Sequence, residues 1–174
     1  MTGSQPMQLP AVDALIATMV AQLRARLPAE RLADARVVGI RTGGAWVAQR
    51  LREALGLATP LGELDISFHR DDYGRSGLNP EVGASKLPWD LGERHVVLVD
   101  DVLYTGRTVR AALNELFDWG RPASVALAVL VSRDGRELPV QPDAAGIEMT
   151  LGPRRHVKLR GPDNLRLELV EGAP

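Results

Sequence analysis

One stretch, from Val96 to Thr108, limits what this chain can fold into more than any other. It begins with four apolar residues, three of them β-branched, continues with the adjacent carboxylates Asp100 and Asp101, and passes through a short polar turn around Gly106. An apolar run with helical spacing follows the turn. That order predicts a buried strand, a turn and the start of a helix, which is the repeating unit of an α/β protein.

The turn in this stretch has the chemistry of an anion site. Backbone N–H groups at the start of a helix have no partner within the helix, and the helix dipole favours negative charge there. Thr105 and Thr108 add hydroxyl donors, and Gly106 lets the backbone approach a ligand closely. Asp100 and Asp101 suit sugar hydroxyls or Mg²⁺ beside a phosphate. The stretch therefore predicts a site for a phosphorylated ribose, against the simpler alternative of an acidic surface turn.

The composition limits the class of protein without indicating a function. The chain has 174 residues, enough for one domain, and its formal net charge of −1 argues against a general affinity for nucleic acid. It has no cysteine, which excludes disulfides and thiolate metal sites. No apolar run approaches the ~20 residues of a membrane span. No secretory signal is visible, so we expect a cytoplasmic protein with a flexible tail over 1–9 and one domain over 10–174.

Alternating strand and helix patterns organise the rest of the chain. Short apolar runs predict strands, at 37–40, 64–68, 96–99 and 124–131. Helical spacing predicts helices, over 11–27, 45–55 and 109–118. This alternation predicts a mostly parallel twisted sheet flanked by helices. Residues after 139 look irregular until late strands near 157–159 and 165–169, and we expect them to form a small hood over the strand ends.

Two further segments belong near the expected ligand. The run from Arg41 to Gly44 joins a predicted strand to a predicted helix, and its two glycines permit a row of exposed N–H groups that suits pyrophosphate. A plain tight turn is the alternative for that loop taken alone. Residues 69–87 have neither a helical nor a strand period, and a segment of that length is usually functional or disordered. We interpret it as a mobile lid.

These segments together resemble the type I phosphoribosyltransferases and, more closely, the PyrR family of pyrimidine operon regulators. The resemblance covers about residues 10–170 and rests on 38–44, 65–72, 96–111 and 120–139. It implies a type I phosphoribosyltransferase fold with a hood and a flexible lid loop. It also implies a uracil phosphoribosyltransferase, which converts uracil and phosphoribosyl pyrophosphate to UMP and pyrophosphate with Mg²⁺. The implied partners are a pyrimidine operon mRNA leader and further copies of the chain, in a homodimer or a larger homo-oligomer.

The resemblance also implies a role for each candidate site residue. Asp100 and Asp101 hold the ribose hydroxyls, directly or through metal and water. The 5′-phosphate loop comprises Tyr104, Thr105, Gly106, Arg107 and Thr108. The pyrophosphate loop comprises Arg41, Thr42 and Gly43. The lid begins with Arg70, Asp71 and Asp72, and Arg70 supplies positive charge to the leaving pyrophosphate.

A few positions depart from the related families. Tyr104 stands where purine-specific members carry an aspartate, which favours a pyrimidine substrate. Gly43 stands where PyrR relatives often have arginine, which weakens contacts to pyrophosphate or RNA. Asp134-Gly135 replaces a Gly-His pair in a loop associated with RNA binding, and a carboxylate there repels phosphate. The enzyme role therefore ranks above the RNA role.

Two alternatives stay open at this point. One is an mRNA-binding attenuator with UMP as co-ligand and little enzymatic role, motivated by local arginines at 24, 26, 31, 136, 154 and 155. The other is a phosphoribosyltransferase for another base, since only 136–140 and 157–159 are candidates for the base pocket. We interpret Trp46, Trp89 and Trp119 as packing or interface residues rather than base-stacking platforms.

Overall fold

The computed structural model describes residues 7–67 and 84–172 of the chain. Within them, a five-stranded parallel sheet has the order β2-β1-β3-β4-β5, and an antiparallel hairpin pairs β6 with β7. The strands are β1 (Arg36–Ile40), β2 (Gly62–Leu64), β3 (His95–Leu103), β4 (Ser124–Arg133), β5 (Ala144–Met149), β6 (Arg155–Arg160) and β7 (Arg166–Glu171). The helices are α1 (Val12–Arg26), α2 (Ala29–Ala33), α3 (Gly43–Leu55) and α5 (Arg107–Trp119).

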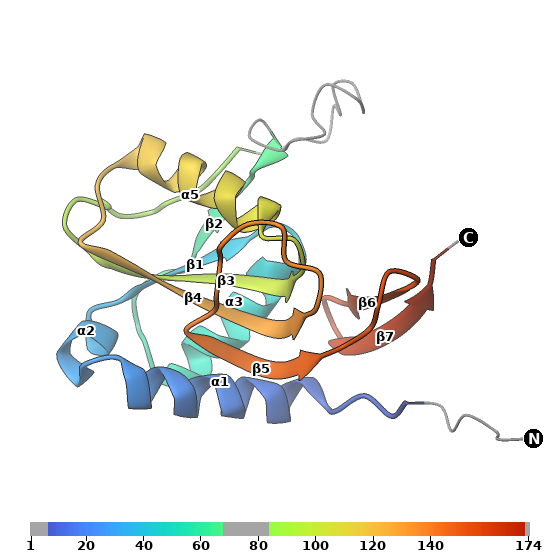
Figure 1. The fold of residues 1–174 in the computed structure, drawn as a ribbon. Helices are drawn as coiled ribbons and strands as arrows, with labels where there is room; N and C mark the ends of the chain where they lie inside the picture. Colours follow the sequence, from blue (N-terminus) through green and yellow to red (C-terminus); the bar gives the residue numbers. More distant parts are fainter. Residues whose placement is uncertain (1–6, 68–83, 173–174) are drawn as a thin grey trace, which may run out of the picture.

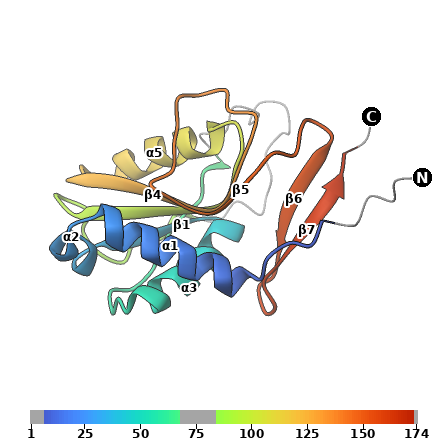
Figure 2. The same cartoon turned by 60° about the horizontal axis from the view of Figure 1, so that its bottom comes forward.

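Helices cover both faces of the sheet. α1 packs on β4 and β5 and α3 packs on β1 and β3, whereas α5 lies on the opposite face (Figure 1). The hairpin β6-β7 stands beyond the carboxyl ends of the strands (Figure 1 and Figure 2), and its Val157 and Leu159 are buried in the core beneath α1 and α3. The α/β fold predicted from the sequence, a mostly parallel sheet flanked by helices with a small hood, is confirmed in these elements.

The central strand β3 shows why the sequence folds into layers. Successive side chains of a strand point to opposite faces. Val97 and Val99 join the core beneath α1 and α3, while Val96 and Leu98 join the core beneath α5. Both sets are buried, which is why the run has no polar residue until Asp100.

Strand β5 was not predicted from the sequence. Because it joins the main sheet, only part of the segment after residue 139 forms the hood. Residues 144–149 extend the parallel sheet beside β4, and only β6 and β7 lie beyond the strand ends. The strand begins Ala-Ala-Gly, a poor strand pattern. The reason is packing, because a Cβ at Gly146 would lie 2.8 Å from the Leu15 Cβ on α1 and 2.6 Å from the Leu130 carbonyl oxygen.

Several predicted boundaries were also wrong. β2 ends at Leu64 instead of reaching residue 68, because the Asp65 carboxylate accepts hydrogen bonds from the backbone N–H and the hydroxyl of Ser67 and turns the chain. β3 runs on to Leu103, so the two aspartates lie inside the strand rather than after it. α3 begins at Gly43, two residues before its predicted start.

None of the helices in the described part of the chain has the length and apolar character that crossing a membrane requires.

Candidate functional site

The connections of the sheet change direction between β1 and β3. From β1 the chain passes through α3 to β2 on one side, and from β3 it passes through α5 to β4 on the other. Because β1 and β3 are parallel neighbours, the helices that follow them, α3 and α5, both begin at the carboxyl edge of these strands. The two helices lie on opposite faces of the sheet (Figure 1). Open α/β sheets bind ligands at such a reversal. The fold therefore brings the two predicted anion loops to one point.

The carboxylates of Asp100 and Asp101 lie against the first turn of α3. Asp100 is 4% exposed and its Oδ1 accepts the backbone N–H of Asp101 at 2.9 Å. Asp101 is half-buried, and its Oδ1 accepts the backbone N–H of Val102 at 2.9 Å. A Cβ built on Gly43 would lie 2.3 Å from Asp101 Oδ2, so the glycine makes room for this carboxylate at the first turn of α3. Asp101 is the more accessible of the pair.

The predicted 5′-phosphate loop leads directly into α5. Gly106 precedes the helix with φ +93°, a left-handed conformation that favours glycine. The Thr105 hydroxyl oxygen accepts the backbone N–H of Arg107 at 3.2 Å. Gly106 has no side chain to cap the helix, and backbone N–H groups at a helix start suit an anion.

The predicted pyrophosphate loop is the short link from β1 to α3. Its Arg41–Thr42 peptide bond is cis, and Gly43 is already helical. The Arg41 Nε lies 2.9 Å from Glu63 Oε2 on the neighbouring strand β2, in a half-buried ion pair. The partner Glu63 was not anticipated from the sequence, although its place on β2 beside β1 follows once those strands pair.

Comparison with known proteins identifies the family. A family model for the phosphoribosyl transferase domain matches residues 7–150. The chain is 53% identical over 165 residues to a "Bifunctional protein PyrR" of Pseudomonas fluorescens, covering 95% of this chain and 98% of the relative. A protein of the same name from Pseudomonas syringae pv. tomato is 52% identical over 165 residues, covering 95% and 97%. The chain belongs to the PyrR family. The predicted phosphoribosyltransferase of PyrR type is thereby confirmed.

Solved structures agree on the fold of this PyrR-family chain. A purine phosphoribosyltransferase from Pyrococcus horikoshii is 26% identical, with a TM-score of 0.55 over 80% of each chain. A hypoxanthine-guanine phosphoribosyltransferase from Bacillus anthracis gives a TM-score of 0.64 over 84% of this chain and 85% of that one. At 13% identity the second likeness shows the fold alone.

The predicted lid residues Arg70, Asp71 and Asp72 lie outside the described residues, and their roles stay predictions. The described flanks are well held. The Ser85 hydroxyl donates to Glu115 Oε1 at 2.7 Å, and the backbones of Glu63 and Lys86 exchange two hydrogen bonds of 2.8 Å. The flank that follows the segment is therefore fixed to β2 and to α5.

Tyr104 packs against the hood of this PyrR-family protein. The Arg133 guanidinium lies 4.0 Å from the Tyr104 ring centroid, and the His156 ring meets Tyr104 edge-on at 6.4 Å. Arg133 is 4% exposed and donates to the carbonyls of Gly152, at 2.6 Å, and Arg155, at 2.7 Å. The sequence indicated a charged loop here but not a buried cation.

Asp134 turns inward, which changes the expectation that its charge faces a ligand. Its carboxylate accepts the backbone N–H groups of Leu151 at 2.8 Å and Gly152 at 3.1 Å, and lies 3.8 Å from Arg133. These hydrogen bonds, above all that from Leu151, and the Arg133 charge hold the pKa of the Asp134 carboxyl below its usual value. The carboxylate thus fixes the turn into β6.

The arginines proposed from the sequence for RNA do not form one patch. Arg24, Arg26 and Arg31 lie at the end of α1 and on α2, whereas 154 and 155 belong to the hood at the opposite end of the molecule (Figure 1). Those five are exposed, but Arg136 is half-buried and hydrogen-bonded within the chain.

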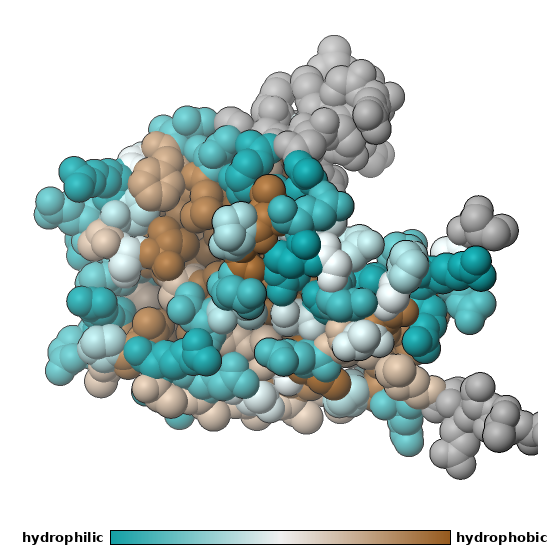
Figure 3. Space-filling model, in the orientation of Figure 1, coloured by the Kyte–Doolittle hydropathy of each residue, from teal (hydrophilic) through white to brown (hydrophobic). Residues whose placement is uncertain are grey.

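Apolar side chains gather on the face that carries α5 (Figure 3). Phe117 and Trp119 on this helix are 54% and 46% exposed. Trp46 and Trp89 are partly buried against the two cores, as a packing role predicts. Trp119 therefore fits the predicted interface role better than a packing role.

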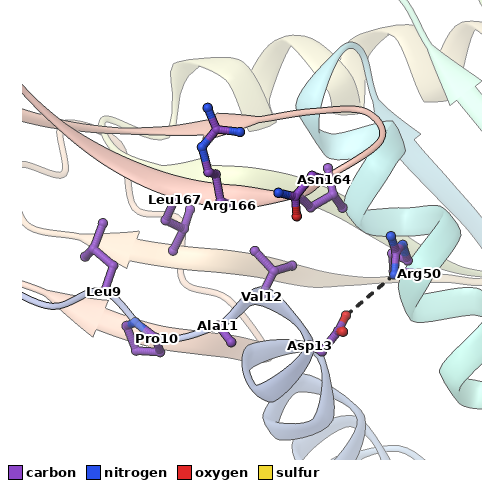
Figure 4. A pocket seen from close by; sticks show the side chains of 10 residues that line it. Leu9, Pro10, Ala11, Val12, Asp13, Arg50, Asn164, Arg166 and Leu167 are labelled. Carbon is purple, nitrogen blue, oxygen red and sulfur yellow. Dashed lines mark ion pairs between the residues drawn. The ribbon is translucent and has the colours of Figure 1, made fainter.

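A separate hollow of about 350 Å³ lies between the start of α1, Arg50 on α3 and the β6-β7 hairpin (Figure 4). Arg50 and Asp13 form an ion pair of 3.6 Å at its rim. None of the predicted site residues that the structure describes lines it. The hollow is distinct from the two anion loops.

Asp100 and Asp101 are the carboxylates of the site that could help to hold Mg²⁺. No group of three or more carboxylate or histidine side chains within residues 7–67 and 84–172 is placed to hold a metal. Asp100 and Asp101 supply hard oxygen donors, and Mg²⁺ commonly binds one or two carboxylates plus substrate phosphates. The residues present therefore fit a metal that arrives with phosphoribosyl pyrophosphate.

Proposed function

We propose that this protein transfers the phosphoribosyl group of phosphoribosyl pyrophosphate to uracil, giving UMP and pyrophosphate. The observation that carries the proposal is that two helix-initiating loops begin at the same edge of the sheet, with Asp100 and Asp101 against the first turn of α3. A substrate with phosphate at one end of a ribose and pyrophosphate at the other matches such a pair of anion sites.

The residues have separable tasks in this reaction. The C1′–oxygen bond to pyrophosphate breaks, the bond from C1′ to the uracil nitrogen forms, and that nitrogen loses its proton. The first turn of α5 holds the 5′-phosphate, and Arg41, Thr42 and Gly43 hold the pyrophosphate. Asp100 and Asp101 orient the ribose hydroxyls, so that the reacting carbon stays fixed while charge develops on it.

Mg²⁺ bound at the carboxylate pair would neutralise charge on the leaving pyrophosphate. Arg70 would add positive charge from the lid, and Asp71 would contact the substrate there. Tyr104 favours a pyrimidine base, because an aspartate at its position is the feature of purine-specific members.

A steady-state assay tests the proposal. Uracil, hypoxanthine and guanine are offered separately with phosphoribosyl pyrophosphate and Mg²⁺, and nucleotide formation is followed. Uracil should give UMP with a far higher kcat/KM than the purines. Asp101→Asn should lower kcat/KM about a hundredfold, a typical cost of losing one group that acts on developing charge. Asp163→Asn, which changes an exposed carboxylate in the β6-β7 turn, should match the wild type.

Absence of UMP with the wild-type protein would contradict this function. Equal rates for the wild type and Asp101→Asn would contradict the assigned site. A higher kcat/KM with a purine than with uracil would contradict uracil as the substrate base. The protein would then still be a phosphoribosyltransferase.

A second function, binding of a pyrimidine operon mRNA leader, has a specific observation in its favour. The Asp134 carboxylate is engaged with backbone N–H groups and Arg133, so the repulsion expected from the sequence is reduced. The arginines lie at opposite ends of the molecule and would contact one RNA best in a homodimer. The exposed Phe117 and Trp119 offer a surface for such a dimer.

We also propose a cytoplasmic location.

Binding of the leader should weaken steeply with salt and tighten with UMP. Binding that is absent, or that ignores both salt and UMP, would contradict the RNA function. The transferase assay is independent of that result.

A further inference from the structure

A second segment of the chain lies directly behind the predicted 5′-phosphate loop. This backing segment comprises residues 136–140, in the link from β4 to β5. The backbone N–H groups of Glu137 and Leu138 both donate to the Thr105 carbonyl, at 2.9 and 3.0 Å. The Glu137 carboxylate also pairs with the Arg107 guanidinium at 2.8 Å. The loop is thus held from behind through backbone and side chain.

Arg136 links the loop to the two neighbouring strands. Its guanidinium donates to the carbonyls of Tyr104 at 2.5 Å and Leu103 at 3.4 Å, where β3 turns into the loop. It also donates to the Val140 carbonyl at 2.9 Å and the Ser132 hydroxyl at 3.2 Å. One half-buried side chain therefore joins the end of β3, the end of β4 and the far end of the backing segment.

The loop also packs against side chains of the backing segment. A Cβ built on Gly106 would lie 3.3 Å from both the Leu138 Cβ and the Val140 Cγ2. The glycine backbone thus rests on the backing segment, with little space for the loop to retreat.

The direction of these hydrogen bonds explains their use. A loop that binds phosphate presents N–H groups, so its carbonyl oxygens must point away from the anion. Carbonyls turned inward need donors, since unpaired buried acceptors are costly. Here the carbonyls of residues 103, 104 and 105 receive theirs from Arg136, Glu137 and Leu138.

We propose that Arg136 is a positioning residue for the 5′-phosphate, acting through the backbone of Tyr104 and without touching the ligand. The inference rests on the proposed function, because it assumes that the loop binds the phosphate of a phosphoribosyl compound. It replaces the sequence-based expectation that Arg136 faces RNA or the base. The planar guanidinium suits this task because it donates in several fixed directions at once.

Calorimetric titration of the full-length protein tests the inference. The probes are ribose 5-phosphate, which carries only the 5′-phosphate, and pyrophosphate, which belongs to the other loop. Arg136→Gln should weaken ribose 5-phosphate binding about tenfold, the effect of losing one charge-assisted anchor, and change pyrophosphate binding less than about twofold. Arg136→Lys should fall between, because an ammonium reaches the Tyr104 carbonyl but not the Val140 carbonyl at the same time. Arg121→Gln, at an exposed arginine beyond α5, is the matched control.

Thermal unfolding of each variant accompanies the titrations, and Arg136→Lys carries the test if Arg136→Gln does not fold. Unchanged ribose 5-phosphate binding in the folded variants would overturn the inference, and so would an equal loss for both probes. Wild-type protein that binds ribose 5-phosphate but forms no UMP would contradict the proposed function and leave this inference standing. Wild-type protein that forms UMP but binds no ribose 5-phosphate would overturn the inference and leave the proposed function standing.

Discussion

The two loops beside Asp100 and Asp101 are held in different ways. The loop before α5 enters its helix through a left-handed Gly106 and rests on the backing segment 136–140. The loop before α3 enters its helix directly at Gly43, and its described side-chain link to another strand is the Arg41–Glu63 ion pair. The difference matches the two ends of the proposed substrate. The 5′-phosphate stays on the ribose from substrate to product, whereas the pyrophosphate has to leave.

The largest expected effect comes from disturbing the firmly held loop. Gly106→Ala should cost about 1–2 kcal/mol of unfolding free energy, because a side chain at φ +93° is strained and its Cβ meets Leu138. The same change should raise the KM for phosphoribosyl pyrophosphate about tenfold, as for one lost anchor. Urea unfolding and steady-state kinetics measure both. A variant with wild-type stability and KM would show that this loop is no more constrained than the other.

Gly43→Ala should act through kcat instead. The new Cβ would approach Asp101 Oδ2 at 2.3 Å and turn the carboxylate aside, while no left-handed backbone is involved. We expect kcat to fall about fivefold, roughly 1 kcal/mol of transition-state stabilisation. The free energy of unfolding should stay the same or rise, since alanine suits a helix better than glycine. A change confined to KM would mean that Gly43 does not set the position of Asp101.

Glu63→Gln should tighten the binding of pyrophosphate to the loop before α3. Losing the half-buried partner frees the Arg41 guanidinium for pyrophosphate. Product inhibition by pyrophosphate should strengthen about threefold, in keeping with the small free energy of such pairs. Glu168→Gln removes a comparable partner from Arg160 on the hood and is the control. Weaker inhibition in Glu63→Gln would mean that Glu63 positions Arg41 for the ligand.

The smallest expected effect is a change of thermal stability at Asp134, whose carboxylate holds the turn into β6. Because the folded protein lowers its pKa, Asp134 stabilises the fold above the unfolded pKa of about 4, and that stability is lost as the pH falls through the lower folded value. Asp134→Asn should therefore lower Tm at pH 7, and the difference from the wild type should disappear in acid. Thermal melts from pH 7 downward measure this. A difference that persists or grows in acid would contradict it.

The sequence predicted the parts of this architecture that depend on local pattern. The four buried residues at 96–99 and the glycine turn after them indicated a strand, a turn and a helix, and all three are present, whereas the anion-binding role of the turn stays a prediction. Amphipathic spacing likewise predicted α1 almost to its ends. Short-range pattern was enough because each element carries its own burial signal.

Features that depend on contacts between distant segments were not predictable in this way. β5 begins with small residues because α1 packs closely against it at Gly146. Small residues do not predict a strand. The engagement of Arg136 and Asp134 within the chain depends on where the link from β4 to β5 folds back. A charged loop looks the same in sequence whether its side chains face solvent or satisfy buried carbonyls. For the same reason the sequence placed Arg136 on an RNA surface.

A crystal structure of the full-length protein with UMP would test the difference between the loops most directly. The account predicts the UMP phosphate within hydrogen-bonding distance of the backbone N–H groups at 106–108, with Arg136 still on the Tyr104 carbonyl and the ribose hydroxyls facing Asp101. The phosphate seated instead on the first turn of α3, beside Arg41 and Gly43, would contradict it.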